Sequence, residues 1–233
     1  MRIWDVNPGY LNRQSLLGEH RELHAIAAII KYNKKGYSRH PETLRWKDFG
    51  WALSQRHRLL AAEMNLRSFT DRSPVRIKTQ PQKWPREFVD SPADQFSILE
   101  KKYVNKEQGR IPLPENVQQL WAQHHYSVMA RDEAEYKYIG GWVTSRKSGR
   151  GIDEIYPELV SLLRCPPVEA NLRNTLEQMW NYLCAYTPHP ATAMKKESLR
   201  HLLKQIQRMA VLHDIAYLKE STALGELPAW QIK

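Results

Sequence analysis

The spacing of apolar residues most constrains the fold of this chain, because it follows the period of an α-helix in most segments that lack proline. In the first such segment, apolar residues recur at Leu16, Leu23, Ile26, Ala27 and Ile30. This spacing predicts a helix over residues 12–31 with one buried face. The preceding Asn7-Pro8-Gly9 is a turn signal, and we expect it to fold the amino terminus back towards that helix.

The same periodicity predicts further helices, and no segment shows the pattern typical of a strand. The predicted helices span residues 41–66, 91–103, 115–130, 132–143, 153–163, 169–186 and 195–218. Four prolines between residues 74 and 92 exclude a continuous helix there. Residues 105–114 contain Gly109, Pro112 and Pro114, which indicates a linker. We therefore expect an all-α protein with two helical domains, residues 1–108 and 109–233, joined by a short Pro/Gly-containing linker.

Charge is distributed unevenly between these two parts. The chain carries 35 basic and 25 acidic residues, a net charge of +10. Residues 1–108 hold 20 basic and 12 acidic side chains, whereas residues 109–233 hold 15 and 13. Such an excess attracts polyanions, so the first part is the candidate for binding nucleic acid, although many basic domains bind none.

The composition also limits the compartment and the chemistry. No apolar run approaches the length of a membrane span, and the first residues contain no signal-peptide core. The two cysteines, Cys165 and Cys184, have neither CxxC spacing nor a nearby Cys/His cluster, which predicts buried thiols rather than metal ligands. We expect a soluble, cytoplasmic protein that does not associate with membranes.

A reactive group is available at the amino terminus itself. A backbone α-amine has a pKa of about 7.7–8.0, so a useful fraction is neutral and nucleophilic near pH 7. Glu19, Glu22 and Ile26 fall near one line of the first helix, which begins a few residues later. A carboxylate on that line is a candidate partner for the amine.

Three short motifs in this stretch align without a gap to a known family. They are Met1-Arg2-Ile3, Leu11-x-x-Gln14 and Glu19-x-Arg21-Glu22-Leu23. In these residues the chain resembles the pyrimidine-dimer DNA glycosylases of the bacteriophage endonuclease V type. The resemblance continues more loosely through residues 55–64, which are similar to the family's second basic helix, and ends near residue 105.

The resemblance implies a role for individual residues. It places the nucleophilic α-amine on Met1, the essential glutamate on Glu22, and DNA contacts on Arg2, Gln14 and Arg21. Methionine is expected to remain at the terminus because the bulky Arg2 follows it. Two family positions differ, since Ser15 stands where the family has a histidine and Ala25 where it has an arginine. We therefore expect the contacts with the lesion to differ from those of the family.

Other basic residues of the first part are candidates for contacts with DNA. Arg39 lies in the loop between the first two predicted helices, where aromatic, basic and hydroxyl groups gather; an ordinary solvated connector is an equally good interpretation. Arg56 and Arg58 lie in the segment similar to the second basic helix. Between them, His57 is interpreted as a surface or half-buried histidine rather than a catalyst.

The second part is similar, over residues 110–225, to the YbgA-like domain of unknown function. The similarity rests on residues 120–132, Tyr138-Ile139-Gly140, Cys165-Pro166-Pro167 and Asn171. Residues from His124 to Arg131 form a polar cluster here. Without a carboxylate at a convincing spacing, this cluster is interpreted as a structural hydrogen-bonding group in preference to a catalytic or ligand-binding one.

The resulting functional prediction is a DNA glycosylase with abasic-site lyase activity. Its expected partner is double-stranded DNA that contains pyrimidine dimers or abasic sites. The imine chemistry implied by the resemblance needs neither a cofactor nor a metal. Two alternatives remain: a non-catalytic DNA-binding or damage-sensing protein, and a modified-base enzyme that uses the second part, whose own partner is unknown.

Overall fold

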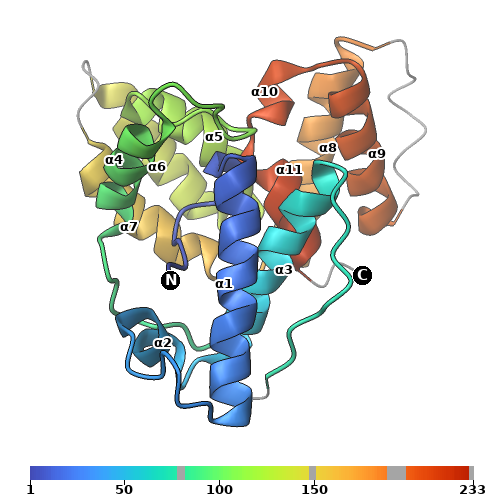
Figure 1. Ribbon diagram of the computed structural model, residues 1–233. Coiled ribbons are helices and arrows are strands. Elements are labelled where there is room, and N and C mark those ends of the chain that lie inside the picture. Colours follow the sequence, from blue (N-terminus) through green and yellow to red (C-terminus); the bar gives the residue numbers. More distant parts are fainter. Residues whose placement is uncertain (78–81, 147–150, 188–197, 231–233) are drawn as a thin grey trace. The chain divides into compact units, whose positions relative to one another are not determined.

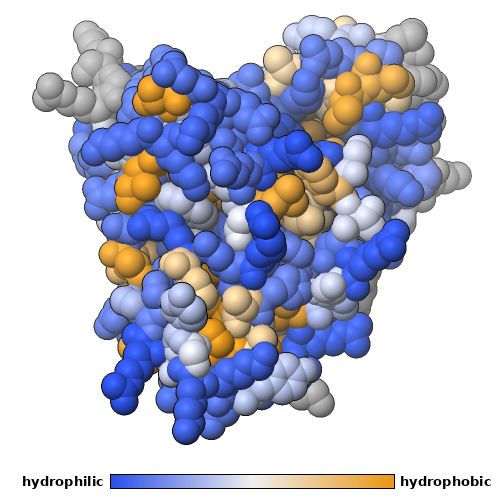
Figure 2. Space-filling model, in the orientation of Figure 1, coloured by the Kyte–Doolittle hydropathy of each residue, from blue (hydrophilic) through white to orange (hydrophobic). Residues whose placement is uncertain are grey.

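The computed structural model describes residues 1–77, 82–146, 151–187 and 198–230. Every regular element in these ranges is an α-helix or a 3-10 helix, so the predicted all-α class is confirmed. The chain divides into two compact units, Met1–Gly109 and Arg110–Lys233 (Figure 1). Hydrophilic residues predominate on the face shown in Figure 2, and hydrophobic ones form small separate patches. Independent folding of the two parts stays a prediction.

Unit 1 begins with the short 3-10 helix η1 (Pro8–Tyr10), which the Asn7 side chain caps by accepting a hydrogen bond from Gly9 N. The remaining helices of unit 1 are α1 (Arg13–Tyr32), α2 (Pro41–Trp46), α3 (Gly50–Leu66) and α4 (Pro92–Tyr103).

The two ends of α1 follow from the sequence. The Asn12 side chain caps its amino end by accepting from Ser15 N, and Asn33 ends it in the left-handed conformation with φ of 50°. The Ser91 side chain caps α4 in the same way as Asn12 caps α1. Both helices were predicted at these positions, and both predictions are confirmed.

The single helix predicted over residues 41–66 is wrong, because α2 ends at Trp46 and α3 begins at Gly50. At Phe49 the backbone leaves the helical region, with φ of −118° and ψ of 40°. The apolar spacing of Trp46, Phe49 and Leu53 continues through the break, which is why periodicity alone missed it. Gly50, with its high conformational entropy, is the local sequence signal for it.

The core of unit 1 forms where α1 packs beside α3 (Figure 1). Leu16 and Leu23 of α1 and Leu53 and Leu60 of α3 are fully buried in it. Their burial explains why the apolar stripe of α1 faces inward.

Two contacts fix the turn that precedes α1. Arg67, just after α3, donates hydrogen bonds to Leu11 O at 2.7 Å and to Gly9 O at 3.0 Å. Gly109 lies so close that an added Cβ would stand 2.5 Å from Gly9 O, so only glycine fits there. The turn is therefore held by segments that lie far along the chain.

Unit 2 is built around α5 (Val117–Met129), which contacts most of its neighbours. The other elements are α6 (Glu133–Ser145), α7 (Ile152–Leu163), α8 (Glu169–Cys184), α9 (Leu199–Leu212), α10 (Ala216–Lys219), α11 (Thr222–Glu226) and η3 (Leu227–Ala229). The continuous helix predicted over residues 195–218 is wrong, since Asp214 adopts φ of 51° between α9 and α10. Residues 195–197 of that prediction lie outside the described residues.

Membrane insertion was not expected. None of the described helices combines the length and the apolar character needed to cross a bilayer.

Candidate active site and nucleic-acid interface

A buried ion pair holds the amino-terminal segment against α1 and α3. Glu19 of α1 accepts from Arg56 of α3 at both carboxylate oxygens, at 2.7 and 2.8 Å. The same carboxylate accepts from Trp4 N at 3.2 Å, and the Arg56 guanidinium donates to Val6 O at 2.9 Å. Both charged side chains thus bind the backbone of residues 4–6 as well as each other.

The charge of Glu19 depends on this partner. The Glu19 side chain is completely shielded from solvent. Burial raises the pKa of Glu19 to about 7, and the guanidinium of Arg56 opposes that effect. Sequence reasoning placed Glu19 on the right helical line but missed its pairing with Arg56, because the two residues come from different helices.

The position of Arg56 argues against the DNA contact that was predicted for this residue. Only 4% of this residue is exposed, and three of its guanidinium N–H groups are directed to Glu19 and Val6. A phosphate could reach it only by breaking the pair that holds the amino-terminal segment. We therefore assign Arg56 a positioning role.

Further along the segment, Asp5 is bound on both sides. The Asp5 carboxylate accepts from Gln95 Nε2 at 3.0 Å and pairs with Arg45, and Asp5 N donates to Gln95 Oε1 at 2.7 Å. With the bonds to Trp4 and Val6, these contacts fix the backbone over three consecutive residues. The path of the chain towards Met1 is thereby set.

The amino terminus lies at Glu22. The Arg2 amide donates to Glu22 Oε2 at 2.5 Å, and both residues are half-buried. One residue spans at most about 3.6 Å, so the α-amine of Met1 lies within roughly 6 Å of that carboxylate oxygen. The fold thus brings together Met1 and Glu22, the two residues that were predicted to be catalytic.

The Arg2 guanidinium is occupied in the free protein. It pairs with Asp90 at 2.8 Å and lies over the Trp4 ring, 4.8 Å from its centroid. A phosphate contact by Arg2 would replace Asp90, which is partly exposed and easily rehydrated.

The other predicted DNA contacts are exposed. Gln14 and Arg21 stand seven residues apart on α1, which is two turns, so they share one face at a separation of about 10 Å. Gly18 lies between them with nothing within 4 Å of the position of an added Cβ. Arg39 lies between α1 and α2, and Arg58 on α3 donates to Gln55 Oε1. All four predicted contacts keep access to solvent.

The two positions that depart from the family differ in their surroundings. Ser15 is buried, so its side chain does not face a nucleic acid, whereas Ala25 is exposed and short. Neither side chain can extend to a nucleic acid and form the hydrogen bonds that a histidine or an arginine would form.

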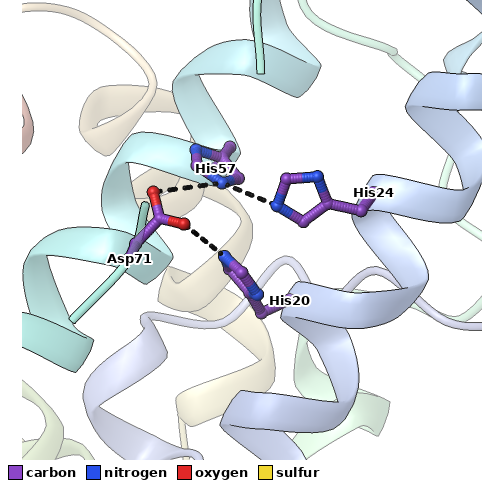
Figure 3. A group of neighbouring side chains, drawn as sticks. All are labelled: His20, His24, His57 and Asp71. Carbon is purple, nitrogen blue, oxygen red and sulfur yellow. Dashed lines mark hydrogen bonds and ion pairs between the residues drawn. The ribbon is translucent and has the colours of Figure 1, made fainter. Parts of the chain in front are cut away.

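A cluster of three histidines and an aspartate was not predicted. His20 and His24 of α1, His57 of α3 and Asp71 converge (Figure 3), with one potential ligand atom from each within 4.8 Å of the others. His57 was expected at or near the surface and is instead buried, with 3% exposed. The i,i+4 spacing of His20 and His24 is a signal that could have indicated this group.

The polar cluster of unit 2 has a structural arrangement. Arg131 forms a buried pair with Glu226 at 2.8 and 2.9 Å and also donates to Ser127 O and Cys165 O, both at 2.7 Å. Glu226 is the carboxylate that the local sequence lacked, and it comes from 95 residues further along the chain. His124 is fully buried with Nδ1 2.9 Å from Leu120 O, and burial lowers its pKa to about 4.

The two cysteines were predicted to be buried, and this prediction is wrong. Cys165 is exposed in the connection between α7 and α8, and Cys184 is partly exposed as the last residue of α8. Both residues lie at or beyond the end of a helix, where the apolar pattern does not define a buried face.

Residues 1–77 match the pyrimidine dimer DNA glycosylase family. The match covers about a third of the chain and includes α1, α3 and all four residues of the histidine–aspartate cluster. It supports a pyrimidine dimer DNA glycosylase, acting on DNA that contains pyrimidine dimers.

Other comparisons add no relative. Neither the curated proteins nor the solved structures contain a match to the chain. The similarity of residues 110–225 to the YbgA-like domain stays a prediction.

Proposed function

We propose that the protein excises pyrimidine dimers and cleaves abasic sites through an imine formed by the α-amine of Met1. The observation that carries this proposal is the hydrogen bond of 2.5 Å from Arg2 N to Glu22. It keeps the α-amine of Met1 within reach of a carboxylate on a rigid helix. The glycosylase family match over residues 1–77 supports the same reaction class.

The amine serves as nucleophile at C1′ of the damaged nucleotide. Its lone pair forms the C1′–N bond, and the base leaves with the electron pair of the glycosidic bond. Loss of an amine proton and opening of the sugar ring then give a protonated imine. Removal of a C2′ proton breaks the C3′–O bond by β-elimination, and water later releases the amine.

Glu22 contributes charge and proton transfer. A carboxylate beside C1′ stabilises the positive charge that develops on the sugar and on the imine. It also accepts and returns protons during ring opening and elimination. Because Glu22 is only half-buried, substrate can approach it without unfolding of the segment.

Exposed cationic and polar side chains of unit 1 would position the DNA. Unit 1 carries the larger part of the excess positive charge of the chain, eight of ten charges. Arg21, Gln14, Arg39 and Arg58 are the proposed backbone contacts, and Arg2 joins them after exchange of Asp90 for a phosphate. A pyrimidine dimer is already poorly stacked, which lowers the cost of distorting the duplex there.

Borohydride trapping on abasic-site DNA tests the proposal directly. Protein with a scarless amino terminus should be trapped covalently, and peptide mapping should place the adduct on Met1. Protein with one residue added before Met1 should not be trapped, because the amine is displaced by about 3.5 Å from Glu22 and C1′.

Both preparations should bind undamaged duplex equally, which serves as the control for folding. Equal trapping rates would remove Met1 from the mechanism and direct attention to Lys31, Lys34 and Lys35. Absence of trapping in the scarless protein, with binding intact, would favour a non-catalytic DNA-binding protein.

A further inference from the structure

The histidine–aspartate cluster combines ligands from three segments. His20 and His24 are one turn apart on the same face of α1, His57 comes from α3, and Asp71 from the segment that follows α3 (Figure 3). Only 15% of the His20 side chain and 13% of the Asp71 side chain are exposed. These two side chains are thus largely shielded from solvent.

The polar atoms of this cluster face one another. His24 Nε2 and His57 Nε2 are 3.1 Å apart, so one of the two nitrogens donates and the other accepts. The buried His20 Nε2 lies 3.3 Å from Asp71 Oδ1, and His57 Nε2 lies 3.6 Å from Asp71 Oδ2 (Figure 3). Three ring nitrogens and a carboxylate therefore converge on one point, an arrangement that a single cation can occupy.

The side-chain types suit a cation. Neutral imidazole and ionised carboxylate are the forms that bind metals, and the ordinary pKa values of histidine and aspartate favour both forms at pH 7.

We propose that His20, His24, His57 and Asp71 bind one divalent transition metal ion, with zinc as the preferred ion. In a tetrahedral zinc site with bonds of about 2.0–2.1 Å, ligand atoms lie roughly 3.3 Å apart. The cluster has separations of 3.1 Å for His24–His57, 3.3 Å for His20–Asp71 and 3.6 Å for His57–Asp71. Small rotations of the side chains would complete the geometry.

The donor set selects the class of ion. Three imidazole nitrogens and one carboxylate oxygen suit zinc, and also cobalt, nickel or iron, whereas calcium and magnesium require mainly oxygen ligands. With four protein ligands the coordination is closed, which is typical of a structural zinc site.

The metal lies away from the proposed chemistry. On a helix with 3.6 residues per turn, His20 and His24 are each displaced by about 160° from Glu22. The ion would therefore join α1, α3 and the Asp71 segment from the opposite face of α1, without contact with the sugar. This inference does not depend on the proposed imine reaction, which needs no metal.

Metal content provides the first test. The full chain, produced without a histidine tag or a metal-affinity step, should contain about one zinc ion per molecule when its metal content is measured by elemental mass spectrometry. After removal of zinc by a chelator, Co²⁺ should restore the strong visible absorption of tetrahedral coordination. Zinc should also raise the midpoint of thermal unfolding of the metal-free protein.

Matched variants then locate the site. Asp71→Asn and His20→Gln, both at the partly exposed rim, should bind Co²⁺ at least about tenfold more weakly and lose the zinc-dependent thermal shift. Asp48→Asn and His213→Gln, at exposed positions outside the cluster, should behave as the wild type. Circular dichroism of all four variants without metal separates loss of a ligand from loss of the fold.

Two results would overturn the proposal. One is a metal-free chain that takes up neither Zn²⁺ nor Co²⁺. The other is unchanged Co²⁺ affinity in folded Asp71→Asn and His20→Gln. Borohydride trapping by the chelated protein is scored separately, so failure of the metal site and failure of the imine mechanism remain distinguishable.

Discussion

Replacing Arg56 by methionine removes one half of the buried pair that holds the amino-terminal segment. Methionine retains much of the length and apolar volume of arginine, so the change removes charge and hydrogen bonds with little loss of packing. Glu19 then keeps only the bond from Trp4 N, at 3.2 Å, and Val6 O loses its donor. The variant therefore tests the positioning device rather than the reacting groups.

The expected cost follows from the burial of the partner. Removing one member of a buried ion pair costs about 3–5 kcal/mol, because the other charge stays desolvated. Protonation of Glu19 limits this cost, since burial already raises the pKa of Glu19 to about 7 in the presence of Arg56. We expect a loss of about 3 kcal/mol in the free energy of unfolding at pH 7. That is a large share of the roughly 5–15 kcal/mol typical of a domain.

Arg58→Met is the matched control. Arg58 lies on the same helix, is exposed and donates a hydrogen bond to the nearby Gln55, so its loss should change stability by about 0.5 kcal/mol or less. Urea unfolding followed by circular dichroism gives the overall change, and hydrogen exchange of the α1 amides reports on unit 1 separately. The double variant Glu19→Gln/Arg56→Met should be more stable than the sum of its single changes predicts.

The assay also has a functional readout. Release of the segment should slow borohydride trapping by Arg56→Met even when DNA is saturating, whereas Arg58→Met, at a proposed DNA contact, should mainly lower the affinity for DNA. If Arg56→Met costs no more stability than Arg58→Met, the buried pair does not hold the amino terminus, and the reasoning from its geometry fails.

Four further predictions concern single residues. Glu22→Gln should bind abasic DNA normally but lose most strand cleavage in a gel assay, whereas the exposed Glu100→Gln should cut at the wild-type rate. Arg21→Ala should reduce the slope of log affinity against log salt by about 0.9, as one lost phosphate contact requires, and an unchanged slope would exclude that contact. Gly18→Ala should raise the free energy of unfolding by up to about 1 kcal/mol, because alanine favours the helix and the added Cβ meets open space. The same change should weaken DNA binding where the DNA backbone approaches α1 at Gly18, and an unchanged affinity would place the DNA elsewhere. Because burial lowers the pKa of His124 to about 4, its contribution to the free energy of unfolding should be complete above about pH 6.5 and should decline towards pH 4, by about 2 kcal/mol at pH 5. His124→Gln should flatten this decline when unfolding by urea is measured across the same pH range.

Local order in this protein was largely predictable, because it rests on short-range physics. Helical periodicity and capping residues located α1 and α4 to within a residue or so. The errors arose where an apolar pattern continued across a break, at Phe49 and at Asp214, whose backbone angles leave the helix. Leu212, beside the second break, is 65% exposed, so its apolar character misled the periodicity argument.

Pairing between distant residues was not predictable. Periodicity assigns a residue to a face of its helix, but it does not say which residue of another helix meets that face. Glu19 and Arg56 are separated by 37 residues, and Arg131 and Glu226 by 95. Arg56 was therefore interpreted as a DNA contact, although its charge is used inside the fold.

The same pairing explains why the register of the amino terminus should be fixed. Glu19 binds the backbone N–H of Trp4, and Arg56 binds the backbone carbonyl of Val6, so the segment is held through main-chain atoms. The buried Ile3 and Trp4 side chains add a second constraint, because a slip by one residue would exchange them with half-buried neighbours. An extra residue before Met1 therefore has no route to be absorbed by sliding, and it must displace the α-amine from Glu22. A nucleophile placed at the chain terminus thus depends on a rigid segment behind it, and the buried Glu19–Arg56 pair provides that rigidity from the face of α1 that also carries Glu22.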